Sequence, residues 1–201
     1  MSASSHNFPV MPGSDAYQVS YNTHSGGNAR WHTTLGGYPV FYPNRAIADR
    51  NLLTYTSAPL QKALEATGET YVTLYLHADQ PDTDIYVYLE DVTPTGEVNY
   101  VSEGTYRASH TRAGELPYYT LSPAHSDLRG DVLPAFGKTE VRKMEISLLM
   151  DSHLFRRGHS IRIALAGADS SYFVILPQPA PLWNVYHGGA FASSVTLPAA
   201  I

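Results

Sequence analysis

The chain has 201 residues and a formal net charge of −5, and its 13 basic residues are scattered rather than clustered. Without a contiguous positive field, binding to nucleic acid or to an anionic membrane surface is not expected. Cysteine is absent, which excludes disulfides, thiolate nucleophiles and zinc-thiolate sites. The 15 tyrosines and 14 prolines favour strands separated by loops over helices.

Residues 1–50 predict an irregular lead-in to one domain that occupies residues 51–201. The lead-in is rich in Gly, Asn, Ser, Pro and His and has no sustained period of 2 or 3.6 residues. Its first 13 residues lack the basic and apolar regions of a signal peptide, and no stretch elsewhere is apolar enough for a transmembrane helix. The sequence leaves the compartment open, with a cytoplasmic location favoured.

Alternation of polar and apolar residues predicts β-strands along the rest of the chain. In the segment 83–92, for example, Ile85, Val87 and Leu89 share one face, and the opposite face carries Tyr86, Tyr88 and Glu90. The predicted strands are 69–78, 83–92, 97–103, 141–150, 160–166, 185–187 and 193–197. Residues 105–138 lack such alternation and predict a long excursion. Strands at this spacing indicate an all-β fold, a two-sheet β-sandwich of jelly-roll type.

A catalytic serine is not expected in this chain. The nucleophile elbow of serine hydrolases requires G-x-S-x-G, and no serine here has both glycines. Ser160 follows Gly158 but precedes Arg162, and Ser102 precedes Gly104 but follows Tyr100. The nine histidines form no H-E-x-x-H motif. The sequence therefore predicts no catalytic residue, no resident metal and no cofactor.

A group of oxygen ligands lies in the connection between two predicted strands. Asp79, Asp82 and Asp84, with His77 nearby, are close enough in sequence to hold a hard cation. The alternative is a turn in which Pro81 fixes the backbone and the carboxylates accept hydrogen bonds from backbone amides. The loop lacks the glycine and terminal glutamate of an EF-hand, which favours the turn.

Several ordered segments resemble the C-terminal domain of the CocE/NonD family, which includes X-Pro dipeptidyl-peptidases and cocaine esterase. The resemblance extends from about residue 29 to the end of the chain. Its most characteristic part is the motif that ends in Ile161-Arg162-Ile163. The segments that carry it are Leu52–Leu60, Thr67-Gly68, Pro81–Asp84, Leu89–Gly96, Glu103–Ala108, His153–Ile163, Val185–Gly189 and Val195–Pro198.

The resemblance implies a non-catalytic, galactose-binding-like jelly roll that packs on an α/β-hydrolase domain and helps to wall its substrate pocket. The Ser-Asp-His triad would then lie in that other domain, and this chain alone would be inactive. The runner-up is a free-standing module that binds carbohydrate or peptide, since tyrosines and the tryptophans Trp31 and Trp183 can stack on sugars. An independent esterase or peptidase would need a nucleophile that the sequence does not offer.

Aromatic residues of the lead-in are candidates for contact with the hydrolase domain or subunit. Trp31, Tyr38, Phe41 and Tyr42 gather in sequence too irregular to build a core of its own. Without a hydrolase partner, these rings would be covered in a homo-oligomer or would pack along the chain's own sandwich.

Overall fold

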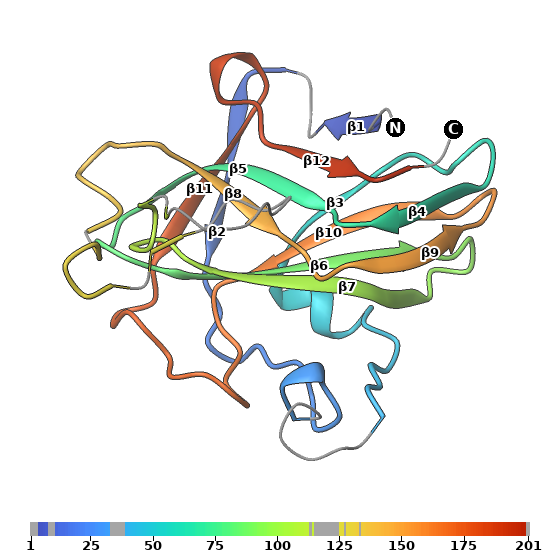
Figure 1. Cartoon of the computed structure of the whole chain (residues 1–201), viewed down its shortest axis with the longest axis horizontal. Coiled ribbons are helices and arrows are strands. Elements are labelled where there is room, and N and C mark those ends of the chain that lie inside the picture. Colours follow the sequence, from blue (N-terminus) through green and yellow to red (C-terminus); the bar gives the residue numbers. More distant parts are fainter. Residues whose placement is uncertain are drawn as a thin grey trace.

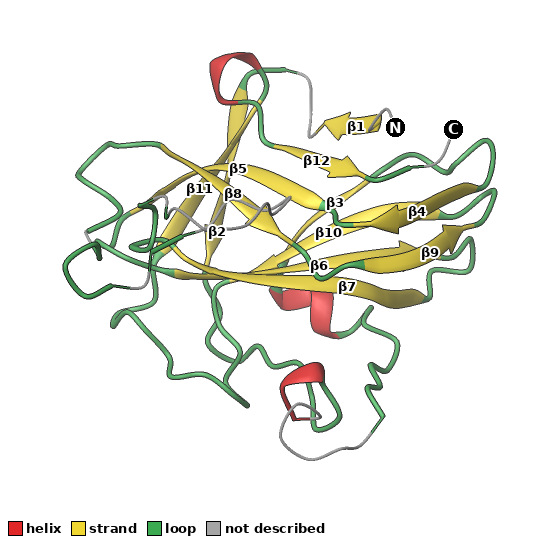
Figure 2. Cartoon of the chain, viewed as in Figure 1, coloured by secondary structure: helices red, strands yellow, loops and turns green. Residues whose placement is uncertain are grey.

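The computed structural model describes residues 4–7, 11–32, 39–112, 114, 125–126, 128–132 and 134–199 (Figure 1). Two short 3-10 helices in these ranges are η1 (Ala48–Asn51) and η2 (Gly189–Phe191). The strands are β1 (Ser4–Asn7), β2 (Gly13–Gln18), β3 (Leu53–Thr56), β4 (Leu64–Gly68), β5 (Tyr71–Ala78), β6 (Asp84–Val92), β7 (Val98–Arg107), β8 (Arg142–Ser147), β9 (Asp151–Phe155), β10 (Ser160–Ala166), β11 (Leu182–His187) and β12 (Ser194–Leu197). The predicted all-β class is confirmed (Figure 2).

The strands form antiparallel sheets. One sheet has the order β1-β12-β5-β11-β2, with β8 paired to the other edge of β5. The second has the order β3-β10-β6-β7, and β4 and β9 form a separate pair. No helix in the described part of the chain is long and apolar enough to cross a membrane.

The two larger sheets bury one face each against a shared core, which makes the fold a β-sandwich. The predicted inward faces of β5, β6 and β10 all contribute to this core, among them Leu74, Val87 and Ile163. Trp183 is fully buried in it and donates from Nε1 to Thr83 Oγ1 at 3.1 Å. Trp183 is therefore not available as a sugar-stacking platform. Two facing sheets do not by themselves define a jelly roll, so the jelly-roll type stays a prediction.

The outer face of the four-stranded sheet is buried as well. Tyr86, Tyr88, Ala164 and Ala166 form a second apolar cluster on this face, although alternation alone predicts solvent there. Residues of the lead-in and the connection to β3 lie over the sheet, seen in blue and cyan below it in Figure 1. We call residues 39–52 of this covering the cover segment.

Several boundaries differ from the sequence prediction. Part of the lead-in is regular, because β2 pairs along β11 and β1 pairs with β12. The strand predicted for 141–150 ends at Ser147, and Met150 is 76% exposed instead of sharing the inward face of Met144. The strands β3, β4 and β9 are additional, and each has only four or five residues, too few to show a clear period.

Truncation of a core residue on β10 should destabilise the sandwich. Ile163 is 3% exposed and pairs with Leu89 on one side and Tyr55 on the other. We expect Ile163→Ala to lower the free energy of unfolding by about 2–5 kcal/mol, because it leaves a cavity between the sheets. Urea denaturation measures this change. Val174→Ala is the control, since Val174 is 77% exposed, and an equal loss in both variants would contradict the placement.

Candidate functional site

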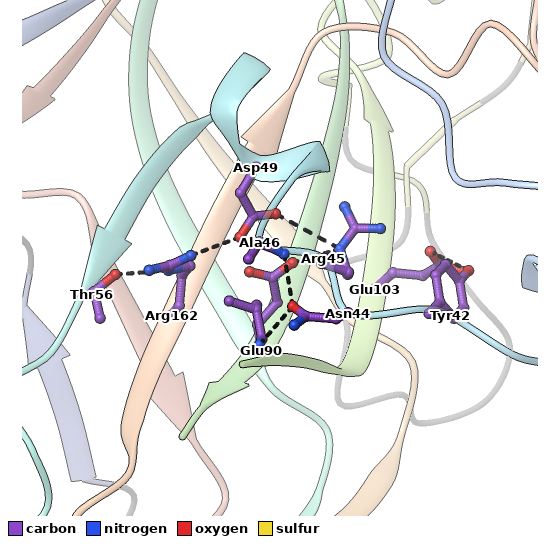
Figure 3. A network of polar contacts seen from close by, with 10 residues as sticks. Tyr42, Asn44, Arg45, Ala46, Asp49, Thr56, Glu90, Glu103 and Arg162 are labelled. Atoms are coloured by element: carbon purple, nitrogen blue, oxygen red, sulfur yellow. Dashed lines mark hydrogen bonds and ion pairs between the residues drawn. The ribbon is translucent and has the colours of Figure 1, made fainter. Parts of the chain in front are cut away.

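A buried polar network joins the cover segment to the outer face of the four-stranded sheet (Figure 3). Arg45 Nε donates to Glu90 Oε1 at 2.6 Å, with only 4% and 0% of the two side chains exposed. Arg162 Nη1 donates to Asp49 Oδ2 at 2.7 Å. Two guanidinium groups and two carboxyl groups thus meet in a site largely closed to solvent, where ion pairs are far less screened than at a surface.

The sheet register places the two sheet residues of the network. Arg162 on β10 lies directly opposite Glu90 on β6, so both side chains project from the same outer face. Arg162 also lies opposite Thr56 of β3 and donates from Nε to Thr56 Oγ1 at 2.9 Å. The guanidinium is therefore held in one position while its Nη1 reaches Asp49.

Local hydrogen bonds place the two residues of the cover segment. Asn44 Oδ1 accepts from the backbone N–H groups of Ala46 and Val98, both at 3.0 Å, which ties the segment to the start of β7. The Arg45 N–H donates to Val98 O at 3.0 Å, and the Asp49 N–H donates to Arg45 O at 2.9 Å. This last bond closes a turn that leads into η1, and it brings Asp49 back toward Arg45.

Two carboxyl oxygens in the network have no donor. Glu90 Oε2 and Asp49 Oδ1 are both buried and have no hydrogen-bond partner among the described residues, although Arg45 Nε lies 3.9 Å from Asp49 Oδ1. Burial, together with the charge of Asp49, raises the pKa of Glu90 to about 8, although Arg45 acts in the opposite direction. A protonated Glu90 can donate a hydrogen bond to Asp49, and we therefore expect the two carboxyl groups to share one proton.

A second polar group continues the network along β7. Glu103 is 2% exposed, and the Tyr42 hydroxyl lies 2.9 Å from each of its carboxylate oxygens. The Tyr42 ring stacks on Tyr100 with centroids 3.9 Å apart and planes at 12°. Arg30 Nε lies 3.5 Å from Glu103 Oε1. Burial raises the pKa of Glu103, while the Tyr42 hydroxyl and Arg30 hold it down.

The structure places three of the four aromatic residues predicted to face a partner. Trp31 packs edge-on against Phe173 at 5.0 Å, and Tyr42 is held by Tyr100 and Glu103, so both make contacts inside the chain. Phe41 between them is 61% exposed. Tyr38 lies outside the described residues.

The carboxylates of the candidate cation site contact protein groups in the fold. Asp79 Oδ1 accepts from the Leu182 N–H at 2.9 Å. Asp82 accepts from the Ser109 N–H at 2.9 Å and from Arg107 Nε at 2.8 Å, and Asp84 lies 3.5 Å from Arg107. The hydrogen bonds that Asp79 and Asp82 accept from backbone amides are of the kind that the turn interpretation predicts. Among the residues whose placement is described, no group of three or more His, Asp or Glu side chains is arranged to hold a metal ion. His77, the fourth member, lies with Nδ1 3.0 Å from Glu140 O.

One cluster of ionisable residues was not predicted from the sequence. Asp91 on β6 lies between two imidazoles, with Oδ2 2.9 Å from His153 Nε2 and Oδ1 2.7 Å from His159 Nδ1. No serine hydroxyl is hydrogen bonded to either ring in the described part of the chain, so a Ser-His-Asp arrangement is not formed there. The cluster ties β6 to β9 and to the turn before β10.

Comparison with known proteins places this geometry in a hydrolase context. Residues 8–196 match the model of the X-Pro dipeptidyl-peptidase C-terminal non-catalytic domain. A Mycobacterium bovis protein named as a serine esterase is 44% identical over 189 residues, which are 92% of this chain and 30% of that protein. A protein of the same description from Mycobacterium tuberculosis gives the same values. The chain thus spans about a third of the length of these relatives.

Solved structures agree on the fold at low sequence identity. A CocE/NonD family hydrolase from Staphylococcus aureus has a TM-score of 0.66 at 15% identity, covering 97% of this chain and 34% of that one. An aminopeptidase from a marine sediment Thaumarchaeota archaeon has a TM-score of 0.67 at 14% identity, covering 96% and 34%. An α-amino acid ester hydrolase has a TM-score of 0.62 at 16% identity, covering 94% and 33%.

The shared proton makes stability depend on pH in a defined direction. The ordinary pKa of Glu90 is 4.5 and its pKa in the fold is about 8, so the folded chain binds more protons between these values. Stability should therefore fall as pH rises from about 5 to about 8, with a contribution from Glu90 on the order of 3 kcal/mol. Burial also raises the pKa values of Glu103 and Asp84, which act with the same sign.

Glu90→Gln tests this assignment. The amide can accept from Arg45 and donate to Asp49, as the protonated acid does, without titrating. We expect the variant to match the wild type near pH 5 and to exceed it near pH 8 in thermal or urea unfolding. Glu97→Gln, at an exposed position, is the control. A Glu90→Gln variant with the same pH slope as the wild type would exclude the shared proton.

Proposed function

Because the chain belongs to the family of X-Pro dipeptidyl-peptidase C-terminal non-catalytic domains, we propose that it packs on an α/β-hydrolase domain and helps to wall the substrate pocket there. The hydrolase domain is supplied either by the same polypeptide or by a separate subunit. It performs ester or peptide hydrolysis, and the present chain acts as its accessory domain.

The observation that carries this proposal is the match of the chain to a non-catalytic domain over residues 8–196. The relatives named as serine esterases are about three times as long, which leaves room for a catalytic domain outside the matched part. The sequence itself has no nucleophile elbow, and within the described residues no serine hydroxyl is hydrogen bonded to the histidines of the Asp91 cluster.

We assign the contact with the hydrolase domain to the surface around Phe41. Phe41 is 61% exposed and Val40 beside it is 41% exposed, so the cover segment presents two apolar side chains in succession. The next residue, Tyr42, is fixed by stacking on Tyr100 and by its hydroxyl at Glu103. The exposed pair therefore sits on a backbone that is already ordered, which lowers the entropic cost of docking.

The isolated chain should not hydrolyse nitrophenyl esters or X-Pro dipeptide amides above background, and a fluorophosphonate probe should not label it. A chimaera tests the positive side of the proposal. In it, this chain replaces the matching segment of the mycobacterial relative, and we expect soluble protein with esterase activity. The relative without that segment is the control. Turnover by the isolated chain that a single serine substitution abolishes would contradict the proposal.

Without a hydrolase partner, the surface around Phe41 should drive self-association at high protein concentration. We expect light scattering to show a concentration-dependent dimer that Phe41→Ser disperses, because that substitution removes an exposed aromatic ring without disturbing the contacts of Trp31 and Tyr42. Val174→Ser is the matched control, since Val174 is 77% exposed on another segment. A wild-type chain that stays monomeric throughout would refute self-association through this surface.

A further inference from the structure

A small cavity lies between the cover segment, the lead-in and the outer face of the four-stranded sheet. Its volume is about 140 Å³, against a share of about 30 Å³ for a water molecule in the liquid. This is room for a group of a few heavy atoms. The cavity is lined on the sheet side by Tyr88, on the cover segment by Arg45 and Asn51, and on the lead-in by Asn22, Thr23 and His24.

Arg45 brings unused hydrogen-bond donors to this cavity. Its side chain is only 4% exposed. Its Nε donates a hydrogen bond to Glu90 Oε1 at 2.6 Å and lies 3.9 Å from Asp49 Oδ1. Nη1 and Nη2 have no hydrogen-bond partner among the described residues, and Figure 3 shows both directed away from Glu90. Neither belongs to the polar atoms that are sealed from solvent, so both remain accessible.

The flat face of the guanidinium is occupied by an aromatic ring. Arg45 Cζ lies 4.0 Å from the centroid of the Tyr88 ring, a cation–π contact that fixes the plane of the group. The two Nη atoms are thus held at the edge of a fixed plane. That edge matches the paired oxygens of a carboxylate or phosphate, which guanidinium groups bind with two parallel hydrogen bonds.

Tyr88 adds a further donor. The residue is 3% exposed, and its hydroxyl has no hydrogen-bond partner in the described part of the chain. Burial raises the pKa of this hydroxyl above its ordinary value, so it keeps its proton at neutral pH. A buried tyrosine hydroxyl usually finds a partner, and an acceptor inside the cavity would supply one.

The charges around the cavity also favour an anion. Arg45 and Arg162 contribute two positive charges, and the carboxylate of Asp49 contributes one negative charge. The raised pKa of Glu90 keeps this group largely neutral at neutral pH. The buried Asp169 and Glu103 act on the Tyr88 hydroxyl as well, so the attraction for an anion is local to the Nη edge of Arg45 and is not a net charge of the whole site.

We propose that this cavity binds a small oxyanion, a carboxylate or a phosphate, through Arg45 Nη1 and Nη2 and the Tyr88 hydroxyl. The two Nη donors have no protein partner among the described residues, and such a ligand would engage both of them at once. The site lies on the sheet face of this chain, and the inference does not depend on association with a hydrolase.

Titration calorimetry of the whole chain with sodium acetate and with sodium phosphate tests the proposal. The buffer is Tris chloride, and sodium chloride holds the ionic strength constant, so that general screening is the same at every point. We expect saturable one-to-one binding of at least one of the two anions in the millimolar range, together with a rise in melting temperature that chloride does not give. No saturable binding of either anion would overturn the proposal.

Two variants and a control assign the binding to this cavity. Arg45→Lys keeps the charge but loses the paired Nη atoms, and we expect affinity to fall roughly tenfold or more. Arg142→Gln removes a charge from an arginine that is 40% exposed, and it should bind as the wild type does. Equal losses in both variants would show general electrostatic attraction and contradict the site.

Tyr88→Phe keeps the inference testable if Arg45→Lys does not fold. The substitution removes only the hydroxyl and leaves the ring under the guanidinium. We expect a several-fold loss of affinity with an unchanged near-UV circular dichroism spectrum, because one donor to the anion is lost. Unchanged affinity of Tyr88→Phe would remove the hydroxyl from the site.

Discussion

The contact between Arg45 and Glu90 holds the cover segment against the sheet, and much of the chain before β3 depends on it. Both side chains are almost completely buried, so their removal from water is costly and must be offset inside the fold. The offset comes from the 2.6 Å contact, from the Tyr88 ring under the guanidinium and from the adjacent Asp49–Arg162 pair. Loss of the Glu90 carboxyl group would leave the charged Arg45 guanidinium buried without the acceptor of its Nε, which costs on the order of 3 kcal/mol.

The same contact explains why the outer face of the sheet is not a solvent face. The buried Arg45–Glu90 contact and the apolar rings around it are shielded from water by a cover to which Arg45 and Leu52 of the cover segment contribute, together with Phe173. Glu90 keeps its proton in this arrangement, because an ionised Glu90 would place a second buried negative charge beside the carboxylate of Asp49, and the two charges would repel each other. The cover and the protonation state of Glu90 are thus two consequences of one buried contact between Arg45 and Glu90.

The sequence predicted the parts of the fold in which local pattern and tertiary burial agree. Strands β5, β6 and β10 have an apolar face that meets the core, so their alternation is visible. The burial of Tyr86, Tyr88 and Glu90 was not predictable in this way, because the residues that cover them, such as Arg45, Leu52 and Phe173, are distant in the sequence.

The contacts of the network and of the Asp91 cluster were hidden for a related reason. Asp91 is separated from its two histidines by 62 and 68 residues, and Arg45 from Glu90 by 45. No spacing rule connects residues so far apart, and only the register of β6 with β10 brings Glu90 opposite Arg162. The family, in contrast, was recognisable from the sequence, because motifs such as Ile161-Arg162-Ile163 occur in order along the chain.

These features together suit an accessory domain better than an independent site of catalysis. Catalytic groups need access to substrate, whereas the ionisable residues of the network are enclosed and matched with one another. The network holds the backbone of the cover segment in place. This backbone presents the exposed Phe41 next to Tyr42, whose ring is fixed by stacking on Tyr100. An apolar side chain on a rigid support is suited to docking, because little flexibility remains to be lost when a partner covers it. If the proposed docking at Phe41 holds, the buried polar network contributes to it by keeping that surface in place.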